Sequence, residues 1–529
     1  MTNETKPIMY LDGQSLTPTD LYTLRSGETD IALTEEAWEA VAASRGVIDR
    51  IVDQGKVVYG VSTGFGQFAN VCISPDEASL LQKNLIMSHS AGTGTPLSVE
   101  STRMLLALRI NVLAKGFSGI SPPALRTMVK CFNLSLLSSV PRKGSVGASG
   151  DLAPLSHLAL GMLGMGQMWD TYQTPAVLRP AAEVLAEHDV EPLQLKPKEG
   201  LAMINGTQLI CTLLTESLYR SRNLLRTADV CAALSMEALR GTPKAYDARV
   251  HNARPHKGQM LCASRLRWLL QPEGVPSELY QTHMYKGKVQ DAYSMRCVPQ
   301  VHGIASDTVE WVENILTTEL NSGTDNPMVF AAEDETLSGG NFHGEYVAKA
   351  ADYLAIGIGE LANISERRLE RMCNPALSDS LPAFLIKNGG LNSGFMIPQY
   401  TAASLVAQNR VFTHPASTDT VSTSAAQEDH VSMGPNAAMK CIEVVENVET
   451  VLAIELLAAL QGIDLRDDGK GLKLSPAMQA VRERVRTEVD YYDIDRVQYL
   501  DMEKCRQLIA SGVIWETVKP FIGDREDLA

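Results

Sequence analysis

Four stretches of the sequence repeat apolar residues at intervals of three and four, and strong helix formers such as Leu, Ala, Glu and Arg fill them. They cover residues 79–92, 100–116, 207–241 and 344–372. The two longest carry apolar residues on more than one face, so each is expected inside a helical bundle or between subunits. The sequence therefore predicts a mainly α-helical protein.

The chain is too long, at 529 residues, for one ordinary core. A Pro- and charge-rich segment at residues 187–200 is the best candidate boundary. We expect residues 1–200 to form a mixed N-terminal domain and residues 201–529 to form a long-helix bundle with C-terminal helices. Strand-like patterns are few and short, and the clearest cover residues 6–13 and 56–63.

Charge and cysteine content exclude several classes of protein. Lys and Arg number 47 against 62 Asp and Glu, a net charge of −15, and no dense basic run suggests a nucleic-acid partner. The N-terminal segment lacks the pattern of a secretory signal, and no apolar stretch has the length of a membrane span. Nine scattered cysteines contain no CxxC pair, and the histidines show no metal-ligand spacing. We therefore expect a soluble, cytoplasmic protein that does not bind membranes and has neither a disulfide framework nor a metal site.

Residues 144–157, GSVGASGDLAPLSH, place three glycines around Ser149 directly before a predicted helix. Glycine adopts backbone conformations that other residues avoid, so this loop is expected to follow an unusual path. Asp151 is a good N-cap residue, and an apolar helical pattern begins directly after it. The loop is therefore expected at a helix N-terminus, where free N–H groups favour negative charge.

Four interpretations of Ser149 compete. A nucleophile elbow requires G-x-S-x-G, and here the second glycine comes one place too early. A phosphate-binding loop requires Lys followed by Ser or Thr, which the segment lacks. A glycine-rich turn that caps a helix is favoured by these residues alone. The fourth interpretation is chemical: Ala148-Ser149-Gly150 can cyclise into an electrophilic imidazolone when the Gly150 nitrogen attacks the Ala148 carbonyl and two waters leave.

The segment GASGDLAPLSH resembles the signature of the aromatic amino-acid ammonia-lyases and aminomutases, whose electrophile, 4-methylidene-imidazol-5-one (MIO), forms from this tripeptide. Ten further segments resemble family segments in family order: 58–66, 88–92, 204–207, 254–259, 290–300, 319–327, 339–344, 365–368, 390–396 and 424–434. One Ala-Ser-Gly is weak evidence, whereas eleven ordered segments make coincidence very improbable. The resemblance covers nearly the whole chain.

The resemblance implies a fold and an assembly. Members of the family are mainly α-helical, with an MIO-bearing N-terminal domain and a long helical bundle related to fumarase and aspartase. They are homotetramers whose active sites draw residues from more than one subunit, and they use no external cofactor. Such an assembly would cover the helices that are apolar on several faces.

The resemblance also assigns the chemical groups. Ammonium leaves an amino acid poorly and the β C–H is a weak acid, so the reaction needs an electrophile and a strong base. An electrophile built from Ala148, Ser149 and Gly150 would supply what cofactors supply elsewhere. Tyr59 matches the position of the family's proposed base, and a tyrosinate is a stronger base than a carboxylate.

Five further residues are assigned by the same resemblance. Arg296 would pair with the substrate carboxylate, which suits a guanidinium. Tyr293, expected among the catalytic residues, and Gln290 precede it at intervals of three, so the three are expected on one helix face. Asn205 is expected to hydrogen-bond near the electrophile, and Phe342 to form a wall of the pocket.

His89 and Glu428 indicate which amino acid is used. His89 follows Ser88 as in histidine-specific members of the family, although tyrosine aminomutases resemble this pair. Histidine-specific members carry Glu at position 428, where phenylalanine and tyrosine enzymes carry Gln. A carboxylate can accept the N–H of an imidazole, whereas a phenyl ring gains nothing from a buried charge. The resemblance therefore implies conversion of L-histidine to trans-urocanate and ammonia, the first step of histidine degradation.

Two alternatives stay open. A tyrosine or phenylalanine ammonia-lyase, or a tyrosine 2,3-aminomutase, would use the same MIO group. An inactive helical scaffold would keep the fold without the chemistry. Pro398 and Tyr400 stand where related histidine enzymes more usually have Ala and Val, so substrate breadth also stays open.

Overall fold

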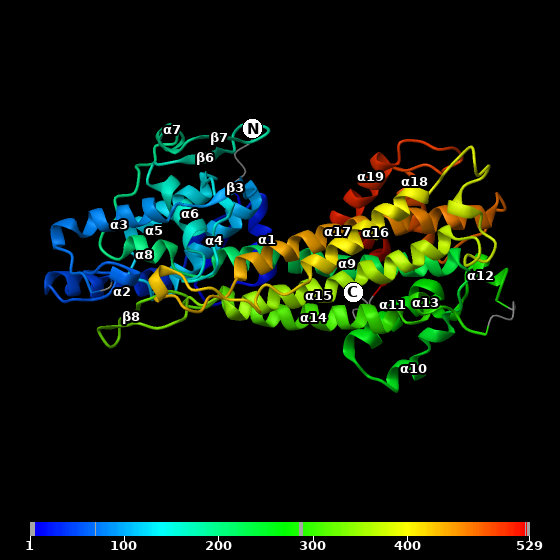
Figure 1. Ribbon diagram of the computed structural model, residues 1–529, viewed down its shortest axis with the longest axis horizontal. Coiled ribbons are helices and arrows are strands. Elements are labelled where there is room, and N and C mark those ends of the chain that lie inside the picture. The colour runs from blue at the N-terminus through cyan, green and yellow to red at the C-terminus, as the bar shows by residue number, and fades with distance from the viewer. Residues whose placement is uncertain (1–5, 69, 285–288, 524, 526–529) are drawn as a thin grey trace. The chain divides into compact units, whose positions relative to one another are not determined.

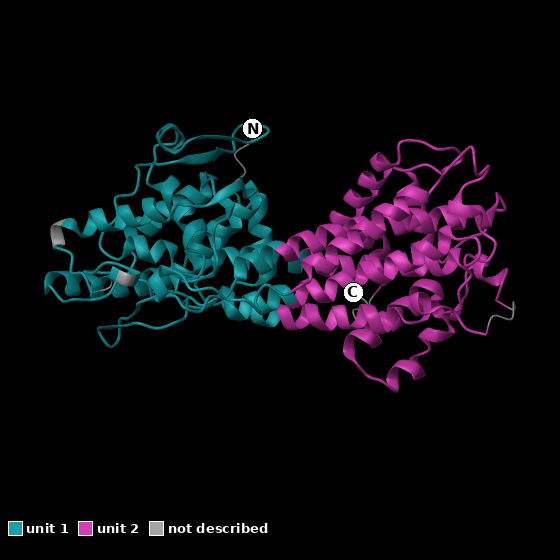
Figure 2. Cartoon of the chain, viewed as in Figure 1, with its two compact units in different colours: residues 1–219, 313–352, 415–439 teal, residues 220–312, 353–414, 440–529 magenta. Residues whose placement is uncertain are grey.

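The computed structural model describes residues 6–68, 70–284, 289–523 and 525 and is mainly α-helical (Figure 1). The chain forms two compact units (Figure 2). Unit 1 comprises Met1–Tyr219, Glu313–Asp352 and Pro415–Met439, and unit 2 comprises Arg220–Val312, Tyr353–His414 and Lys440–Ala529. These units interleave along the chain, so the division expected at residue 200 stays a prediction about domains.

The predicted long helices are confirmed. The four longest helices have residues in both units and are α9 (Gln208–Ala238), α14 (Val298–Leu320), α15 (Glu345–Cys373) and α17 (Gly434–Asp467). Unit 1 also contains α1 (Pro18–Thr23), α2 (Glu35–Asp53), α3 (Pro75–His89), α4 (Val99–Ala114), α5 (Pro122–Asn133), α6 (Leu152–Met162), α7 (Ala181–Glu187) and α8 (Glu199–Ile204). Unit 2 also contains α10 (Ala248–Asn252), α11 (Lys257–Leu270), α12 (Glu278–Gln281), α13 (Tyr293–Arg296), α16 (Met396–Phe412), α18 (Pro476–Arg486), α19 (Gln498–Ala510) and α20 (Val513–Val518). None of the helices among the described residues combines the length and the apolar character needed to cross a bilayer.

Within the described ranges, short strands occur in unit 1 and form four small sheets. The strands are β1 (Ile8–Leu11), β2 (Asp30–Leu33), β3 (Thr93–Pro96), β4 (Leu137–Ser138), β5 (Pro141–Lys143), β6 (Gln167–Asp170), β7 (Val177–Pro180), β8 (Met328–Phe330) and β9 (Glu335–Leu337). β1 pairs with β2 in parallel, and the pairs β3–β5, β4–β6, β6–β7 and β8–β9 are antiparallel. The strand expected within residues 6–13 is therefore confirmed.

The strand expected over residues 56–63 is wrong. This segment forms consecutive turns, in which the backbone N–H groups of Val61 and Ser62 both donate to the Val58 carbonyl. Gly60 has a positive φ of 70°, a conformation that breaks a strand. The apolar residues that suggested a strand belong instead to a loop that carries Tyr59.

α4 lies at the centre of unit 1, because every residue from Ser101 to Ala114 is buried. Its two arginines donate to backbone carbonyl groups: Arg103 Nε donates to Leu24 O at 2.8 Å, and Arg109 Nη1 donates to Asn205 O at 2.8 Å. A buried guanidinium is tolerated only when it is paired in this way. α4 therefore fixes distant loops of unit 1 through charged hydrogen bonds.

Three helices of unit 1 bring the predicted site residues together. α3 packs against α6 and α8, and α6 packs against α8 (Figure 1). His89 is the last residue of α3, Asn205 directly follows α8, and Ser149 lies just before α6. Residues that are far apart in the sequence therefore meet where these helices begin or end.

The long helices of unit 2 are joined by buried polar groups. Arg368 on α15 donates to both carboxylate oxygens of Glu455 on α17, with Nη2 2.9 Å from Oε2. Ser235 on α9 donates to the same carboxylate at 2.6 Å. Arg368 and Glu455 are fully buried, so each charge depends on the other for compensation.

We expect Arg368→Met to destabilise the protein by about 3–5 kcal/mol, because Glu455 would become an uncompensated buried charge. Lys257→Ala is the control: its pair with Glu310 is exposed, and its loss is expected to cost about 1 kcal/mol or less. Calorimetric melting at one protein concentration measures both. Equal Tm values for the two variants would contradict the expectation.

Candidate active site

The loop Ala148-Ser149-Gly150 is held against the segment that precedes α9. Gly150 has a φ of 73° and forms a parallel bridge with Gly206, and the Asp151 N–H donates to Gly206 O at 2.7 Å. A Cβ added at Gly150 would lie 2.1 Å from Gly206 O, closer than atoms can approach. Only glycine fits this position. The contact between Gly150 and Gly206 therefore fixes the position of Ser149, the residue directly before Gly150.

Asp151 is the N-cap residue of α6, as expected, but its side chain does not cap that helix. Its Oδ2 accepts hydrogen bonds from the backbone N–H groups of Leu209 at 2.7 Å and Ile210 at 3.1 Å, at the start of α9. Burial raises the pKa of Asp151 to about 7. The carboxyl group therefore joins the starts of two helices, a role that the spacing within one helix could not reveal.

Ser149 lines a cavity of about 1160 Å³. All the residues that line it belong to unit 1, and they include residues of α3 and α8 and of the loops before α3 and α6. Six of the eleven predicted site residues line this cavity: Tyr59, His89, Ser149, Asn205, Phe342 and Glu428. The cavity is large enough for a small amino acid and is lined by both apolar and polar side chains, as ligand sites usually are.

Glu428 points at the glycine loop. The Ser149 hydroxyl donates to Glu428 Oε1 at 3.0 Å, and the Thr423 hydroxyl donates to Oε2 at 2.9 Å. Each carboxylate oxygen therefore has one donor, and the carboxylate is held at the cavity wall. Thr423 was not identified from the sequence, because no motif links it to a residue five positions later.

Tyr59 lies on a loop before α3 and lines the same cavity as Glu428. The Gly66 N–H donates to its hydroxyl oxygen at 3.3 Å, and the Phe65 ring packs edge-on against it. Burial raises the pKa of Tyr59, and the negative charge of Glu428 raises it further. Its conjugate phenolate would be a stronger base than a free tyrosinate.

His89 ends α3 with its ring in the cavity lining. Its Nδ1 lies 3.0 Å from Ser88 Oγ, and the Ser88 hydroxyl donates its proton to Leu85 O at 3.1 Å. Burial lowers the pKa of His89, so the ring is favoured in its neutral form. A neutral imidazole offers one donor and one acceptor, which suits recognition of another polar ring.

Asn205 is buried, with 3% of its surface exposed, and it borders the cavity. Its Nδ2 donates to Asn326 O at 3.1 Å, while its Oδ1 has no hydrogen-bond partner among the described residues. Arg109 fixes the backbone of Asn205 and also donates to Gln208 Oε1 at 2.7 Å. An unsatisfied buried acceptor at a cavity wall is a group that a bound molecule can satisfy.

Gln290, Tyr293 and Arg296 belong to unit 2 and are not among the residues that line the cavity of the described chain. The expectation that they share a helix face is wrong for Gln290, which precedes the four-residue helix α13. The Tyr293 ring is 71% exposed, and the Arg296 guanidinium lies over it at 4.7 Å. Arg296 Nε is buried and has no hydrogen-bond partner within the described ranges.

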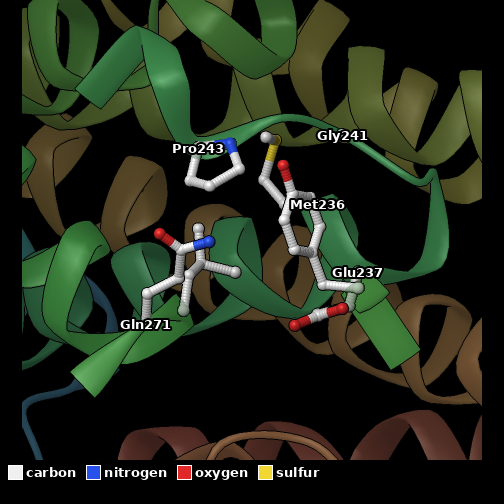
Figure 3. Close-up of a pocket in the computed structure, with 7 residues that line it drawn as sticks. Met236, Glu237, Gly241, Pro243 and Gln271 are labelled. Atoms are coloured by element: carbon white, nitrogen blue, oxygen red, sulfur yellow. The ribbon is translucent and has the colours of Figure 1, made fainter. Parts of the chain in front are cut away.

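A second cavity, in unit 2, has a volume of about 10 Å³ (Figure 3). Glu237 and Gln271 line it; Ser277 donates to Glu237 Oε1 at 2.7 Å, and Oε2 has no partner in the part of the chain that the structure describes. Burial raises the pKa of Glu237 to about 7. The space corresponds to about one water molecule, so an amino acid cannot bind there.

Unit 2 also holds three potential metal ligands that sequence spacing did not reveal: Asp229, Cys262 and His302. The Asp229 Oδ1 accepts hydrogen bonds from Cys262 Sγ at 3.0 Å and from His302 Nδ1 at 2.7 Å, and Arg265 donates to Oδ2 at 2.8 Å. Burial raises the pKa of the Cys262 thiol, which favours its protonated form. Cys262 and His302 both hydrogen-bond to Asp229, and the Arg265 guanidinium compensates the Asp229 charge. The cluster is therefore explained as a buried polar network.

A family model described as "Aromatic amino acid lyase" matches residues 16–487. The chain belongs to this family. A histidine ammonia-lyase from Bos taurus is 54% identical over 519 residues, which cover 98% of this chain and 78% of that protein. A crystal structure of histidine ammonia-lyase from Trypanosoma cruzi matches with a TM-score of 0.90 and 50% identity over 98% of this chain and 97% of that one. Tyrosine aminomutase from Streptomyces globisporus matches with a TM-score of 0.89 and 35% identity over 97% of this chain and 98% of that one.

Membership of the aromatic amino acid lyase family confirms the resemblance seen in the sequence, and the mainly helical fold is confirmed with it. The roles that this resemblance gives to individual residues stay predictions. The cavity beside Ser149 is the candidate active site of this family member, because it gathers six of those residues from six separate segments of unit 1.

In this aromatic amino acid lyase, Gly150→Ala is expected to destabilise the fold more than Gly274→Ala. Both glycines have a φ near 75°, but a Cβ at Gly274 would meet no atom within 4 Å. The left-handed conformation costs each alanine about 1–2 kcal/mol, and the clash with Gly206 adds about 1–3 kcal/mol at Gly150. Thermal melting measures the difference, and equal losses of Tm would show that the close contact does not constrain the loop.

Proposed function

We propose that this protein is a histidine ammonia-lyase that converts L-histidine to trans-urocanate and ammonia, the first step of histidine degradation. The observation that carries this proposal is the Glu428 carboxylate, which lies 3.0 Å from the Ser149 hydroxyl in the cavity that also contains the neutral His89 ring. Both groups suit an imidazole substrate, because a carboxylate accepts its N–H and a neutral histidine can hydrogen-bond to a polar ring. The names of the Bos taurus and Trypanosoma cruzi relatives support the same substrate.

We propose further that Ala148, Ser149 and Gly150 form the MIO group. The residues around them fit it: the loop is cradled by the Gly206 backbone, and Asn205 Oδ1 is a buried acceptor without a partner among the described residues. The position before α6 also favours negative charge on an oxygen of the group. When present, MIO supplies an electrophilic carbon that withdraws electrons from the bound amino acid and makes ammonia a better leaving group.

The side chains in the cavity would bind the substrate and move one proton. The Tyr59 oxygen takes the β-proton, for which its buried position makes the phenolate a strong base. Glu428 accepts the imidazole N–H, and His89 hydrogen-bonds to the same ring. Phe342 forms an apolar wall, and Asn205 orients polar groups near the loop.

The carboxylate-binding residues would come from a second copy of the chain. Arg296 suits a bidentate pair with the substrate carboxylate, and its buried Nε has no partner in the described part of the chain. Tyr293 and Gln290 would join the active site with it. The proposal of a homotetramer is supported by large apolar side chains exposed on the long helices α14 and α15, including Ile304 and Tyr346.

Product identification tests the proposed reaction. Purified protein is incubated separately with L-histidine, L-phenylalanine and L-tyrosine, and the products are separated by chromatography and identified by mass spectrometry. We expect trans-urocanate and ammonia from histidine, with turnover of the other two lower by at least about 100-fold, because an unpaired buried carboxylate would face a phenyl ring. Cinnamate or coumarate as the main product, or a β-amino acid, would instead identify an aromatic lyase or an aminomutase.

Ser149→Ala tests the electrophile. The variant is expected to keep the fold and to lose turnover, because alanine at the centre of the tripeptide cannot lose a hydroxyl to form the exocyclic methylene. Mass spectrometry provides an independent measurement. The measured mass of the wild-type protein, and of its peptide that contains Ala148 to Gly150, should be lower than the mass calculated from the sequence by two waters. An undiminished mass in the wild-type protein would favour an inactive scaffold.

A further inference from the structure

We propose that Thr423 is a positioning residue for the reaction, which holds the Glu428 carboxylate so that one oxygen stays free for the imidazole of the substrate. This inference rests on the proposed function and names a residue that the family motifs did not single out. Three observations carry it: the contacts of the two residues, the backbone between them, and the loss of a competing donor when the tripeptide cyclises.

Thr423 and Glu428 close a tight turn by backbone and side-chain bonds together. The Thr423 N–H donates to Glu428 O at 2.9 Å, and the Glu428 N–H donates to Thr423 O at 3.3 Å. The Thr423 hydroxyl then donates to Glu428 Oε2 at 2.9 Å. The same residue therefore fixes both the backbone and the carboxylate of Glu428, and it leaves Oε1 pointing at Ser149.

The backbone of this turn is strained. Ser424, Ala425 and Ala426 have φ values of 53°, 53° and 66°, although none of them is glycine. Such conformations persist only where surrounding contacts impose them, and they concentrate at functional sites. The reciprocal bonds between Thr423 and Glu428 are the contacts that close this turn. A substitution that weakens these bonds is expected to let the turn relax and the Glu428 carboxylate move.

The turn also touches the loop that carries the proposed base. The Ser424 hydroxyl lies so close to Gly66 that a Cβ there would be 2.7 Å from its oxygen, and the Gly66 N–H donates to the Tyr59 hydroxyl. Tyr59 and His89 are the titratable groups coupled electrostatically to Glu428. The position of Glu428 therefore affects the charge that both of them experience.

Two further titratable groups follow Glu428 in the chain. Asp429 and His430 are exposed, and the His430 ring lies 3.3 Å from His343, the neighbour of Phe342 in the cavity wall. The hydroxyl of Thr423 differs from all of them because it contacts the carboxylate directly.

Cyclisation makes Thr423 the remaining donor. The Ser149 hydroxyl now donates to Oε1, but it leaves as one of the two waters when Ala148-Ser149-Gly150 cyclises. Oε1 then has an open acceptor site, while Oε2 keeps its bond to Thr423. Among the described residues Thr423 is then the donor that holds the orientation of the carboxylate, and the imidazole N–H takes the vacated place.

The test compares variants of the whole protein that differ at this hydroxyl. Thr423→Val removes the hydroxyl and keeps the shape, Thr423→Ala removes it without placing a methyl group beside Oε2, and Thr423→Ser restores it. Thr420→Val is the matched control, because Thr420 lies on the same segment but bonds to the Val431 backbone. The intact mass of each variant is measured to check for the two-water deficit, and kcat/KM for L-histidine is measured at one pH.

Thr423→Val and Thr423→Ala are expected to lower kcat/KM by about 10- to 100-fold, the usual weight of one hydrogen bond to a charged group. Thr423→Ser should return kcat/KM close to wild type, and Thr420→Val should leave it close to wild type as well.

A kcat/KM within two-fold of wild type, in either variant that lacks the hydroxyl, would overturn the positioning role. Failure of Thr423→Ser to restore kcat/KM would overturn it as well. A wild-type protein that shows no two-water deficit, or forms no urocanate, would refute the proposed function itself. The two failures are therefore separate, since the first is seen in the variants and the second in the unaltered protein.

Discussion

The backbones of Gly150 and Gly206 approach so closely that no side chain fits between them. This contact joins the loop before α6 to the start of α9, and the Asp151 carboxylate strengthens it by accepting two backbone N–H groups of α9. The position of Ser149 follows from it, because the serine is the residue next to the bridge. The cavity, the approach of Glu428 and the proposed chemistry all depend on this one contact between two glycines.

Buried charges fix the other side of the same contact. Arg109 donates to the carbonyl of Asn205, directly before Gly206, and Lys198 forms a fully buried pair with Asp325 at 2.9 Å. Burial lowers the pKa of Arg109 to about 10. Charged groups are costly to bury, so their presence shows how strongly this segment must be held. A loosely held segment would leave the loop free to leave the cavity wall.

The division of the predicted site between the two units has a consequence for assembly. The loop, the proposed base and the imidazole-binding groups all lie in unit 1, while Arg296 and Tyr293 lie in unit 2. A homotetramer would bring the second set to the first from another copy, and it would cover the apolar side chains exposed on α14 and α15. The proposed assembly and the proposed reaction therefore support each other, because the substrate carboxylate needs a partner that the described cavity lacks.

The sequence alone determined the long helices, the glycine loop and the chemical types of the site residues. Helical periodicity depends on residues three and four apart, and a motif such as Ala-Ser-Gly is complete within its own segment, so both can be seen without a fold. Tertiary structure decided what depends on contacts between distant segments. The Asp151 carboxylate bonds to α9 and not to its own helix, residues 56–63 form turns that carry Tyr59 to the cavity, and Thr423 reaches Glu428 across a strained turn. These outcomes follow from which segments meet in three dimensions, and local spacing contains no record of such meetings.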